Sequence, residues 1–357
     1  MLKENYNVIG VMSGTSLDGV DLAHIRLSIQ SDKWQFKIGE TQTVLYTSEW
    51  VHTLKNAVGF SNKQLQNLNS DYTALLGKII SNFIEKHAID HLDAVCSHGH
   101  TILHQPQNGL TLQIGNLPEI AAIIRQNVVC DFRVADVAFG GQGAPLVPIG
   151  DRMLFADFDY CLNLGGFSNV SFEDGSGRIA FDISPVNTVL NFYANTLGLP
   201  YDDQGKIARS ANLNQQLIAE LNALNYYRKP FPKSLGFEFV KEIVLPLIEK
   251  YAIPTPDKLH TFTEHVAQQI AFALPEKNGR LLITGGGAYN EFLIERVQHH
   301  LPEMQIVIPG SQILEFKEAL IFALLGVLKL RGEINVLSSV TGASHDHSSG
   351  NVFRYVG

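Results

Sequence analysis

The sequence has few cysteines, no cationic run and no long uninterrupted apolar stretch. Its three cysteines, Cys96, Cys130 and Cys161, lie far apart without zinc or dithiol spacing, so we expect reduced core residues. A formal net charge of −8 and the lack of a Lys/Arg run exclude a general nucleic-acid binder. The segment EALIFALLGVLKL is too short and interrupted to span a bilayer, and the N-terminal MLKENYNVIG lacks the apolar core of a signal peptide. We therefore expect a cytoplasmic protein that binds neither nucleic acid nor membrane.

Two common nucleotide-binding motifs are also missing. No G-x-x-x-x-G-K-[ST] sequence occurs, and the GGQGAP and TGGGAYN segments do not match G-x-G-x-x-G. The segment VMSGTSLDGVD, residues 11–21, still offers small residues whose backbone N–H groups can approach an anion closely, with an ordinary hairpin turn as the alternative. Because this loop has no Lys or Arg, a bound triphosphate would be neutralised by N–H groups, hydroxyls and a divalent cation. Asp18 and Asp21 are therefore candidate Mg²⁺ ligands, with turn-forming aspartates as the alternative.

The chain is long enough for two domains, and one pattern of strands and helices occurs twice. Three strand segments, NVIGVM, VDLAHIRLS and WQFKIGETQTVLY, precede a helix over residues 65–83 and a buried strand, LDAVCSHGHT, that ends in a polar loop. The pattern recurs in YCLNLGGFSNVSFEDGSGRIAFDIS, a helix over residues 263–274 and RLLITGGGAYNEFLIERV, and Gly14 and Gly166 hold comparable places. We predict an α/β fold of two related domains, each a mixed β-sheet with helices, whose small-residue loops face one another across a cleft.

Two segments of the second half carry candidate site residues. Asp182 ends an apolar strand, and we expect Ser184 and Pro185 to cap and begin the next helix. A carboxylate held there suits a general base, with a capping or turn aspartate as the alternative. Gly285–Gly287 lead from a buried strand to a helix start, where a nucleotide can lie against bare backbone.

Three further segments are polar. DFRVADVAFGGQGAPLVP concentrates Asp131, Arg133, Asp136 and Gln142, a composition that indicates a polyol-binding surface. His98 and His100 in SHGHT lack metal-ligand spacing, so we expect hydrogen-bonding residues or core histidines. The C-terminal SHDHSSGN is expected to be a solvated tail without a structural metal.

Together these segments resemble the anhydro-N-acetylmuramic acid kinase family, a branch of the actin, hexokinase and heat-shock chaperone ATPase fold. The motifs that match, in order from Gly10 to Ser344, are GVMSGTSLDGVD, SHGHT, DFRVADVAFGGQGAPLVP, NLGGFSN, DDQGKIARS, PKSLGFE, GGGAYN and VTGAS. The resemblance implies ATP-dependent phosphorylation of 1,6-anhydro-N-acetylmuramic acid at O6, with hydrolytic opening of the anhydro ring. The product would be N-acetylmuramic acid 6-phosphate, made in cell-wall sugar recycling.

The resemblance also implies roles for individual residues, with Asp182 as the base that activates the attacking water. The implied ATP-binding residues are Gly14, Thr15, Ser16, Leu17, Asp18, Gly19, Val20, Asp21, Gly165, Gly166, Asn169, Gly285, Gly286, Gly287 and Asn290. The implied sugar-binding residues are His98, Thr101, Asp131, Arg133, Gln142 and Asn187, and Mg²⁺ would bind at Asp18 and Asp21. Residues 1–128 plus 335–357 would form the domain with the phosphate loop, and residues 129–334 the domain with the catalytic aspartate and the adenosine-binding loop.

The chain departs from the family pattern at two places. ISPVN follows Asp182 where TGPGN is frequent, and His100 stands where glutamine is common. Because Ile183 and Val186 are bulkier than the residues they replace, a kinase for another amino sugar is one alternative. A non-catalytic ATP or sugar sensor is a second, although such a sensor has no need of a base at Asp182. We expect an isologous homodimer.

Overall fold

The computed structural model describes residues 3–14, 17–175 and 177–357. The chain forms two compact units, residues 1–154 with 316–357 and residues 155–315. The sequence-based boundaries at 128/129 and 334/335 differ from these because residues 129–154 and 316–334 belong to the first unit. Lys317 Nζ lies 2.7 Å from Asp151 Oδ1, and this buried ion pair joins the two segments.

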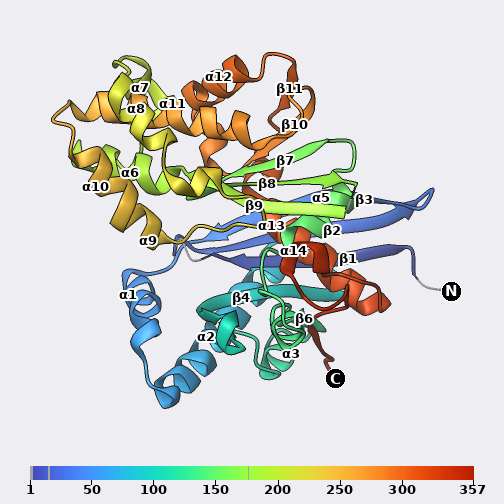
Figure 1. The fold of residues 1–357 in the computed structure, drawn as a ribbon. Coiled ribbons are helices and arrows are strands. Elements are labelled where there is room, and N and C mark those ends of the chain that lie inside the picture. The colour runs from blue at the N-terminus through green and yellow to red at the C-terminus, as the bar shows by residue number, and fades with distance from the viewer. Residues whose placement is uncertain (1–2, 15–16, 176) are drawn as a thin grey trace. The chain divides into compact units, whose positions relative to one another are not determined.

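The first unit is built on one mixed sheet (Figure 1). The sheet has the order β12-β6-β4-β1-β2-β3, with β5 paired to β4. β1, β2 and β3 form an antiparallel meander, while β4 runs parallel to β1 and β6 parallel to β4. The strands are β1 (Asn5–Ser13), β2 (Val20–Gln30), β3 (Lys33–Val44), β4 (Ala94–Gln105), β5 (Leu110–Ile114), β6 (Val128–Cys130) and β12 (Asn351–Phe353).

The helices of the first unit follow the expected apolar periodicity. The predicted helix over residues 65–83 is confirmed as α2, which starts with a capping box at Ser61 and Gln64 and buries its apolar stripe. α13 is kinked at Phe316, the residue where the first unit resumes. The helices are α1 (Ser48–Asn56), α2 (Asn62–Lys86), α3 (Glu119–Ile124), α4 (Val134–Ala138), α5 (Val147–Leu154), α13 (Ser311–Arg331) and α14 (Ser338–Thr341), with 3₁₀ turns η1 (Ala57–Gly59) and η2 (Pro106–Asn108).

The second unit repeats this strand order. Its sheet runs β11-β10-β7-β8-β9, again with an antiparallel meander followed by two parallel strands. This order matches β6-β4-β1-β2-β3 strand for strand, so the predicted α/β class and the predicted duplication are confirmed. The strands are β7 (Tyr160–Leu164), β8 (Phe167–Asp174), β9 (Gly177–Pro185), β10 (Gly279–Thr284) and β11 (Met304–Val307).

Helices of the second unit surround α11, which packs against α6, α7, α8, α12 and β9 (Figure 1). The predicted helix over residues 263–274 is confirmed within α11, which begins eight residues earlier. The helices are α6 (Asn187–Thr196), α7 (Lys206–Arg209), α8 (Gln215–Asn222), α9 (Phe237–Phe239), α10 (Leu245–Glu249), α11 (Thr255–Ala273) and α12 (Glu291–His300), with a π-helix η5 (Val240–Val244) and 3₁₀ turns η3 (Asp203–Gly205), η4 (Asn225–Arg228) and η6 (Gly286–Tyr289).

Three local predictions were wrong. SHGHT lies inside β4 rather than in a polar loop, because β4 continues along β5 as far as Gln105. Ser184 and Pro185 belong to β9, where the Ser184 N–H donates to Ser168 Oγ, and α6 begins only at Asn187. The C-terminal SHDHSSGN is not a solvated tail, since His347 and Ser349 are buried.

Among the described residues, no helix is both long and apolar enough to cross a membrane.

The contact between β1 and α13 leaves no space for a side chain at Gly10. A Cβ there would lie 1.9 Å from the Ala319 carbonyl oxygen, whereas a Cβ at Gly59 would meet nothing within 4 Å. We predict that Gly10→Ala lowers the free energy of unfolding by about 3 kcal/mol through overpacking. Gly59→Ala, the control, should change it by less than about 0.5 kcal/mol. Urea unfolding measures both, and equal effects would contradict the close packing.

Candidate functional site

A buried network of hydroxyl groups fixes the end of β1, immediately before Gly14. Ser13 Oγ lies 2.6 Å from Tyr46 Oη and 2.8 Å from His100 Nδ1, and it accepts a hydrogen bond from Tyr72 Oη at 2.9 Å. Burial lowers the pKa of His100 to about 4 and raises the pKa values of both tyrosines. The loop that follows therefore starts from a fixed, uncharged network of side chains. Of its members, the sequence analysis selected only His100.

The candidate phosphate loop, residues 14–21, begins directly after this network. Thr15 and Ser16 lie outside the described residues. Leu17 has a φ of 61°, its N–H lies 3.4 Å from the Gly14 oxygen, and a Cβ on Gly19 would lie 2.5 Å from the Val44 oxygen. Val20 is fully buried at the start of β2, where it pairs with Val44, so it presents no surface to a ligand. The described residues of this segment therefore turn tightly at Leu17.

A carboxyl group that the sequence analysis missed lies near the two loop aspartates. Burial raises the pKa of Glu318, the Arg133 and Lys317 charges oppose this rise, and the charges of Asp21 and Asp18 add to it. Glu318 as a residue is exposed. Asp21 itself accepts a hydrogen bond from Thr43 Oγ1 at 2.6 Å. Glu318 lies within an apolar helical run, where spacing alone does not single out one carboxylate.

His98 and Arg133 are hydrogen-bonded to each other. Arg133 Nε donates to His98 Nε2 at 2.8 Å, and Arg133 Nη1 donates to the Gly143 oxygen at 2.6 Å. His98 Nδ1 lies 2.8 Å from the Gly99 oxygen, so the proton of this imidazole is on Nδ1. Burial, with the Arg133 charge, holds the pKa of His98 well below its usual range. Both ring nitrogens are thus engaged within the protein, and His98 orients Arg133.

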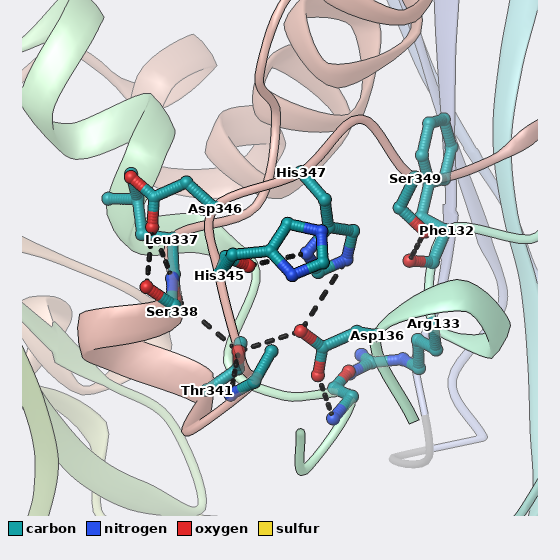
Figure 2. Close-up of polar contacts among 12 residues, drawn as sticks. Phe132, Arg133, Asp136, Leu337, Ser338, Thr341, His345, Asp346, His347 and Ser349 are labelled. Atoms are coloured by element: carbon teal, nitrogen blue, oxygen red, sulfur yellow. Dashed lines mark hydrogen bonds and ion pairs between the residues drawn. The ribbon is translucent and has the colours of Figure 1, made fainter. Parts of the chain in front are cut away.

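Asp136 ties the glycine-rich loop to the C-terminal segment (Figure 2). Its Oδ1 accepts from Thr341 Oγ1 at 2.7 Å and lies 3.6 Å from His347 Nε2, while its Oδ2 accepts from the Gly143 N–H at 2.6 Å. A Cβ on Gly141 would lie 2.2 Å from Asp136 Oδ2. Asp136 is fully buried, so the SHDHSSGN segment helps to hold the loop that carries Gln142.

The other predicted sugar-binding residues of the first unit lie in three different segments. Asp131, with a φ of 67°, accepts from Asn351 Nδ2 at 3.0 Å, and burial raises its pKa. Gln142 is exposed and its N–H donates to the Thr341 oxygen at 2.8 Å. Thr101 Oγ1 accepts from Gln113 Nε2 at 3.3 Å in β4.

In the second unit, polar residues form a row across four strands at one level of the sheet. Thr284 pairs with Asn163, Asn163 with Asn169, and Asn169 with Asp182. Directly paired residues place their side chains on the same face, so strand register brings the predicted residues Asn169 and Asp182 together. Asn163, in the NLGGFSN segment, is a member of the row that the sequence analysis did not select.

Asp182 is held by the segment that follows η4. The Leu235 N–H donates to Asp182 Oδ2 at 2.9 Å. The Asp182 N–H donates to the Lys233 carbonyl oxygen at 3.2 Å, and Tyr226 Oη donates to the backbone carbonyl oxygen of Asp182 at 2.6 Å. Burial raises the pKa of Asp182, and the Leu235 N–H partly offsets this. The result is a fixed carboxylate of increased basicity. The family motif PKSLGFE contains Lys233 and Leu235 of this clamp, and Tyr226 precedes it in η4.

The β7–β8 turn is attached to the start of α6. The Val186 and Thr188 N–H groups donate to the Gly166 oxygen at 2.8 and 3.3 Å, and the Asn187 N–H donates to the Gly165 oxygen at 3.3 Å. These bonds bring Gly165, Gly166 and Asn187 together. They also occupy N–H groups of the helix start that an anion would otherwise use.

The three consecutive glycines have different structural reasons. A Cβ at Gly285 would lie 2.6 Å from Asn163 Oδ1, and one at Gly287 would lie 2.8 Å from Leu164 Cβ, so packing accounts for both. A Cβ at the exposed Gly286 would meet nothing within 4 Å. α12 does not start at the glycines, because η6 intervenes and Asn290 caps α12 through a 3.0 Å bond from the Leu293 N–H. Of these three glycines, Gly286 is the exposed one, with open space beside its Cα.

Comparison with known proteins assigns the family. Residues 6–355 match the family described as Anhydro-N-acetylmuramic acid kinase. The chain belongs to this family. A relative of that name from Hydrogenovibrio crunogenus is 33% identical, with 97% of each chain covered, and one from Vibrio cholerae is 34% identical over the same shares. One from Bacillus cereus is 31% identical, covering 97% of this chain and 98% of its own. The expected enzyme class, a phosphotransferase with an alcohol group as acceptor, is confirmed.

Solved structures resemble the chain more distantly. One is the activator of the 2-hydroxyisocaproyl-CoA dehydratase from Clostridium difficile with bound ADPNP, at 12% identity and a TM-score of 0.44, covering 91% of this chain and 96% of that one. Another is component A of the (R)-2-hydroxyglutaryl-CoA dehydratase from Acidaminococcus fermentans, at 13% identity and a TM-score of 0.46, covering 91% and 99%.

The buried His100 makes stability depend on pH. Its folded pKa of about 4 is below the usual 6.5, so between these values the unfolded chain binds a proton that the folded protein does not. The free energy of unfolding should therefore fall as pH falls from 6.5 to 4, by about 3 kcal/mol from this residue. His100→Gln should remove this part of the decrease in urea unfolding measured at pH 7 and pH 4. An unchanged decrease in the variant would contradict the assignment.

Proposed function

We propose that the protein uses ATP and water to convert 1,6-anhydro-N-acetylmuramic acid to N-acetylmuramic acid 6-phosphate and ADP. Water adds to the anomeric carbon and loses a proton to Asp182. The bond from that carbon to O6 breaks, and the freed O6 forms a bond to the γ-phosphorus as ADP leaves. The observation that carries the proposal is the clamped, desolvated carboxylate of Asp182 in a chain of this family.

The geometry of Asp182 suits a base that acts on water. General-base catalysis is most efficient when the pKa of the base approaches the working pH, and burial moves the pKa of Asp182 in that direction. The Leu235 N–H engages Oδ2, and among the described residues no hydrogen bond reaches Oδ1. Oδ1 is then the atom that takes the proton. Asn169, directly opposite on β8, is the nearest polar neighbour by register.

We assign the ATP phosphates to the Gly14–Asp21 loop and to the Gly286 backbone. Loose phosphoryl-transfer transition states require positioning and charge neutralisation, which N–H groups and a cation supply. Mg²⁺ binds through one or two carboxylates and keeps several waters, and the hard oxygen donors of Asp18 and Asp21 fit this preference. When bound, Mg²⁺ would neutralise phosphate charge. Among the described residues no larger cluster of His, Cys, Asp and Glu competes as a metal site.

We assign the sugar to the surface organised by Arg133. His98 and the Gly143 oxygen fix the guanidinium plane, and burial lowers the pKa of Arg133 only to about 10, so it stays charged at neutral pH. A fixed guanidinium fits the carboxylate of a muramic acid lactyl group. In this assignment His98 positions Arg133 rather than touching the sugar, while Thr101, Asp131, Gln142 and Asn187 remain candidates for the hydroxyl groups.

Asp182→Asn tests the reaction. The wild type with Mg²⁺ and ATP should yield a sugar phosphate one water heavier than the phosphorylated anhydro sugar. The variant should lose activity by at least about a thousandfold, because the base is removed while the Leu235 N–H bond is kept. Glu303→Gln, an exposed carboxylate beyond α12, is the matched control and should stay active. ATP binding without sugar phosphate in the wild type would support a sensor, and turnover of another amino sugar alone would support a different kinase.

Tyr226→Phe tests the clamp. The variant loses the O–H group that donates to the backbone carbonyl oxygen of Asp182. This should lower kcat about tenfold, the effect of one hydrogen bond, with KM unchanged. In the wild type kcat/KM should fall as pH falls through the raised pKa of Asp182, because a protonated carboxyl cannot accept a proton. In the Tyr226→Phe variant, the pH at which kcat/KM falls should differ from that of the wild type. Tyr201→Phe, an exposed tyrosine, is the control, and identical pH profiles for all three proteins would contradict the clamp.

A further inference from the structure

A cavity of about 170 Å³ in the second unit lies beside the segment that holds Asp182. Phe181 and Ile183, the two neighbours of Asp182 in β9, both line it, while Asp182 does not. The complete lining is Phe181, Ile183, Tyr227, Arg228, Lys229, Phe231, Lys233, Gln269, Phe272 and Ala273. No step of the proposed reaction uses the side chains of these residues.

The charged groups of this cavity all have one sign. Arg228, Lys229 and Lys233 are part of its lining, and no Asp or Glu is among the described residues that line it. Burial lowers the pKa of Lys233, whose ammonium group lies 4.8 Å from the Tyr226 ring centroid and 5.7 Å from that of Phe181. A desolvated cation next to two exposed cations favours an anionic ligand.

The remaining walls are mostly aromatic, and two polar side chains, Tyr227 and Gln269, are buried among them. The Phe181 and Phe231 rings stack at 5.3 Å with an interplanar angle of 7°, and Phe272 is 71% exposed on α11. The buried Tyr227 and Gln269 are fixed from behind, since Tyr227 Oη lies 2.9 Å from His265 Nε2 and Gln269 Nε2 donates to Asn222 Oδ1 at 2.8 Å. A preformed pocket with apolar walls and a few oriented polar groups is the usual form of a small-molecule site.

We propose that this pocket is a second ligand site that binds a small organic anion, a phosphate or carboxylate attached to a single ring. The ring lies against Phe231 and Phe272, and the anionic group pairs with Arg228, Lys229 and Lys233. Binding is independent of the proposed function.

An effect on catalysis rests on the proposed function. The Lys233 oxygen accepts the Asp182 N–H, and the next residue but one, Leu235, donates to the Asp182 carboxylate. An anion that draws the Lys233 ammonium away from Tyr226 changes the clamp that sets the position of Asp182. The ligand therefore alters kcat more than KM.

Calorimetric titration of the full chain with phenyl phosphate tests the binding site. We expect saturable binding that saturating Mg²⁺ and ATP do not displace, and no binding of benzyl alcohol, the neutral molecule of similar ring size. Arg228→Gln with Lys229→Gln should weaken binding about fivefold, the effect of two exposed charges. The matched control, Lys241→Gln with Lys250→Gln, removes the same charge from exposed positions outside the pocket and should leave binding unchanged. Phe272→Ala should also weaken it.

Displacement by ATP, equal weakening in the control variant, or the absence of binding would each overturn the proposal. Inorganic phosphate and benzoate distinguish the two anionic groups, and a phosphate that binds as tightly as phenyl phosphate would contradict the aromatic contact. If the protein does not turn over the anhydro sugar, the titrations with phenyl phosphate still test the pocket. If the pocket binds no phenyl phosphate, turnover of the anhydro sugar is still expected.

Discussion

The Leu235 N–H donates to the carboxylate of Asp182, and the proposed chemistry of the second unit depends on that bond. Burial alone would raise the pKa of the carboxyl group and leave it free to rotate. The N–H group limits the rise and fixes one oxygen, which leaves the other for a water molecule. Tyr226 and Lys233 hold the same segment through the backbone of Asp182, so basicity and position are set together.

The two units share one strand topology. In both, a turn links the first two strands of an antiparallel meander, at β1–β2 and at β7–β8. The first turn starts from the hydroxyl network of Ser13, Tyr46 and Tyr72, whereas the second is attached through backbone bonds to the start of α6. The register of the second sheet then places Asn163, Asn169 and Asp182 in one row. Duplicated strands thus place a connecting segment at the same point of both sheets, and the described side chains around the two segments differ.

Much of this fold was predictable because it depends on local patterns. The alternation in β2 and the apolar stripe of α2 specify their structures within a few residues. The Asp182 strand and the glycine-rich segments were found for the same reason. Contacts between distant segments were not predictable. The Leu235 N–H reaches Asp182 across 53 positions, and Thr341 reaches Asp136 across 205. No spacing rule connects such pairs, which is also why the sequence predicts a solvated tail for SHDHSSGN and does not single out Glu318.

The central claim is that water attacks the sugar while the phosphoryl group passes to O6. Turnover of 1,6-anhydro-N-acetylmuramic acid with Mg²⁺ and ATP in ¹⁸O-labelled water tests this most directly, with early samples fragmented in a mass spectrometer and unlabelled product incubated in the same water to correct for exchange. The account predicts one ¹⁸O atom in the sugar fragment of the product and none in its phosphate. A product without the label, or with the label in phosphate, would contradict it.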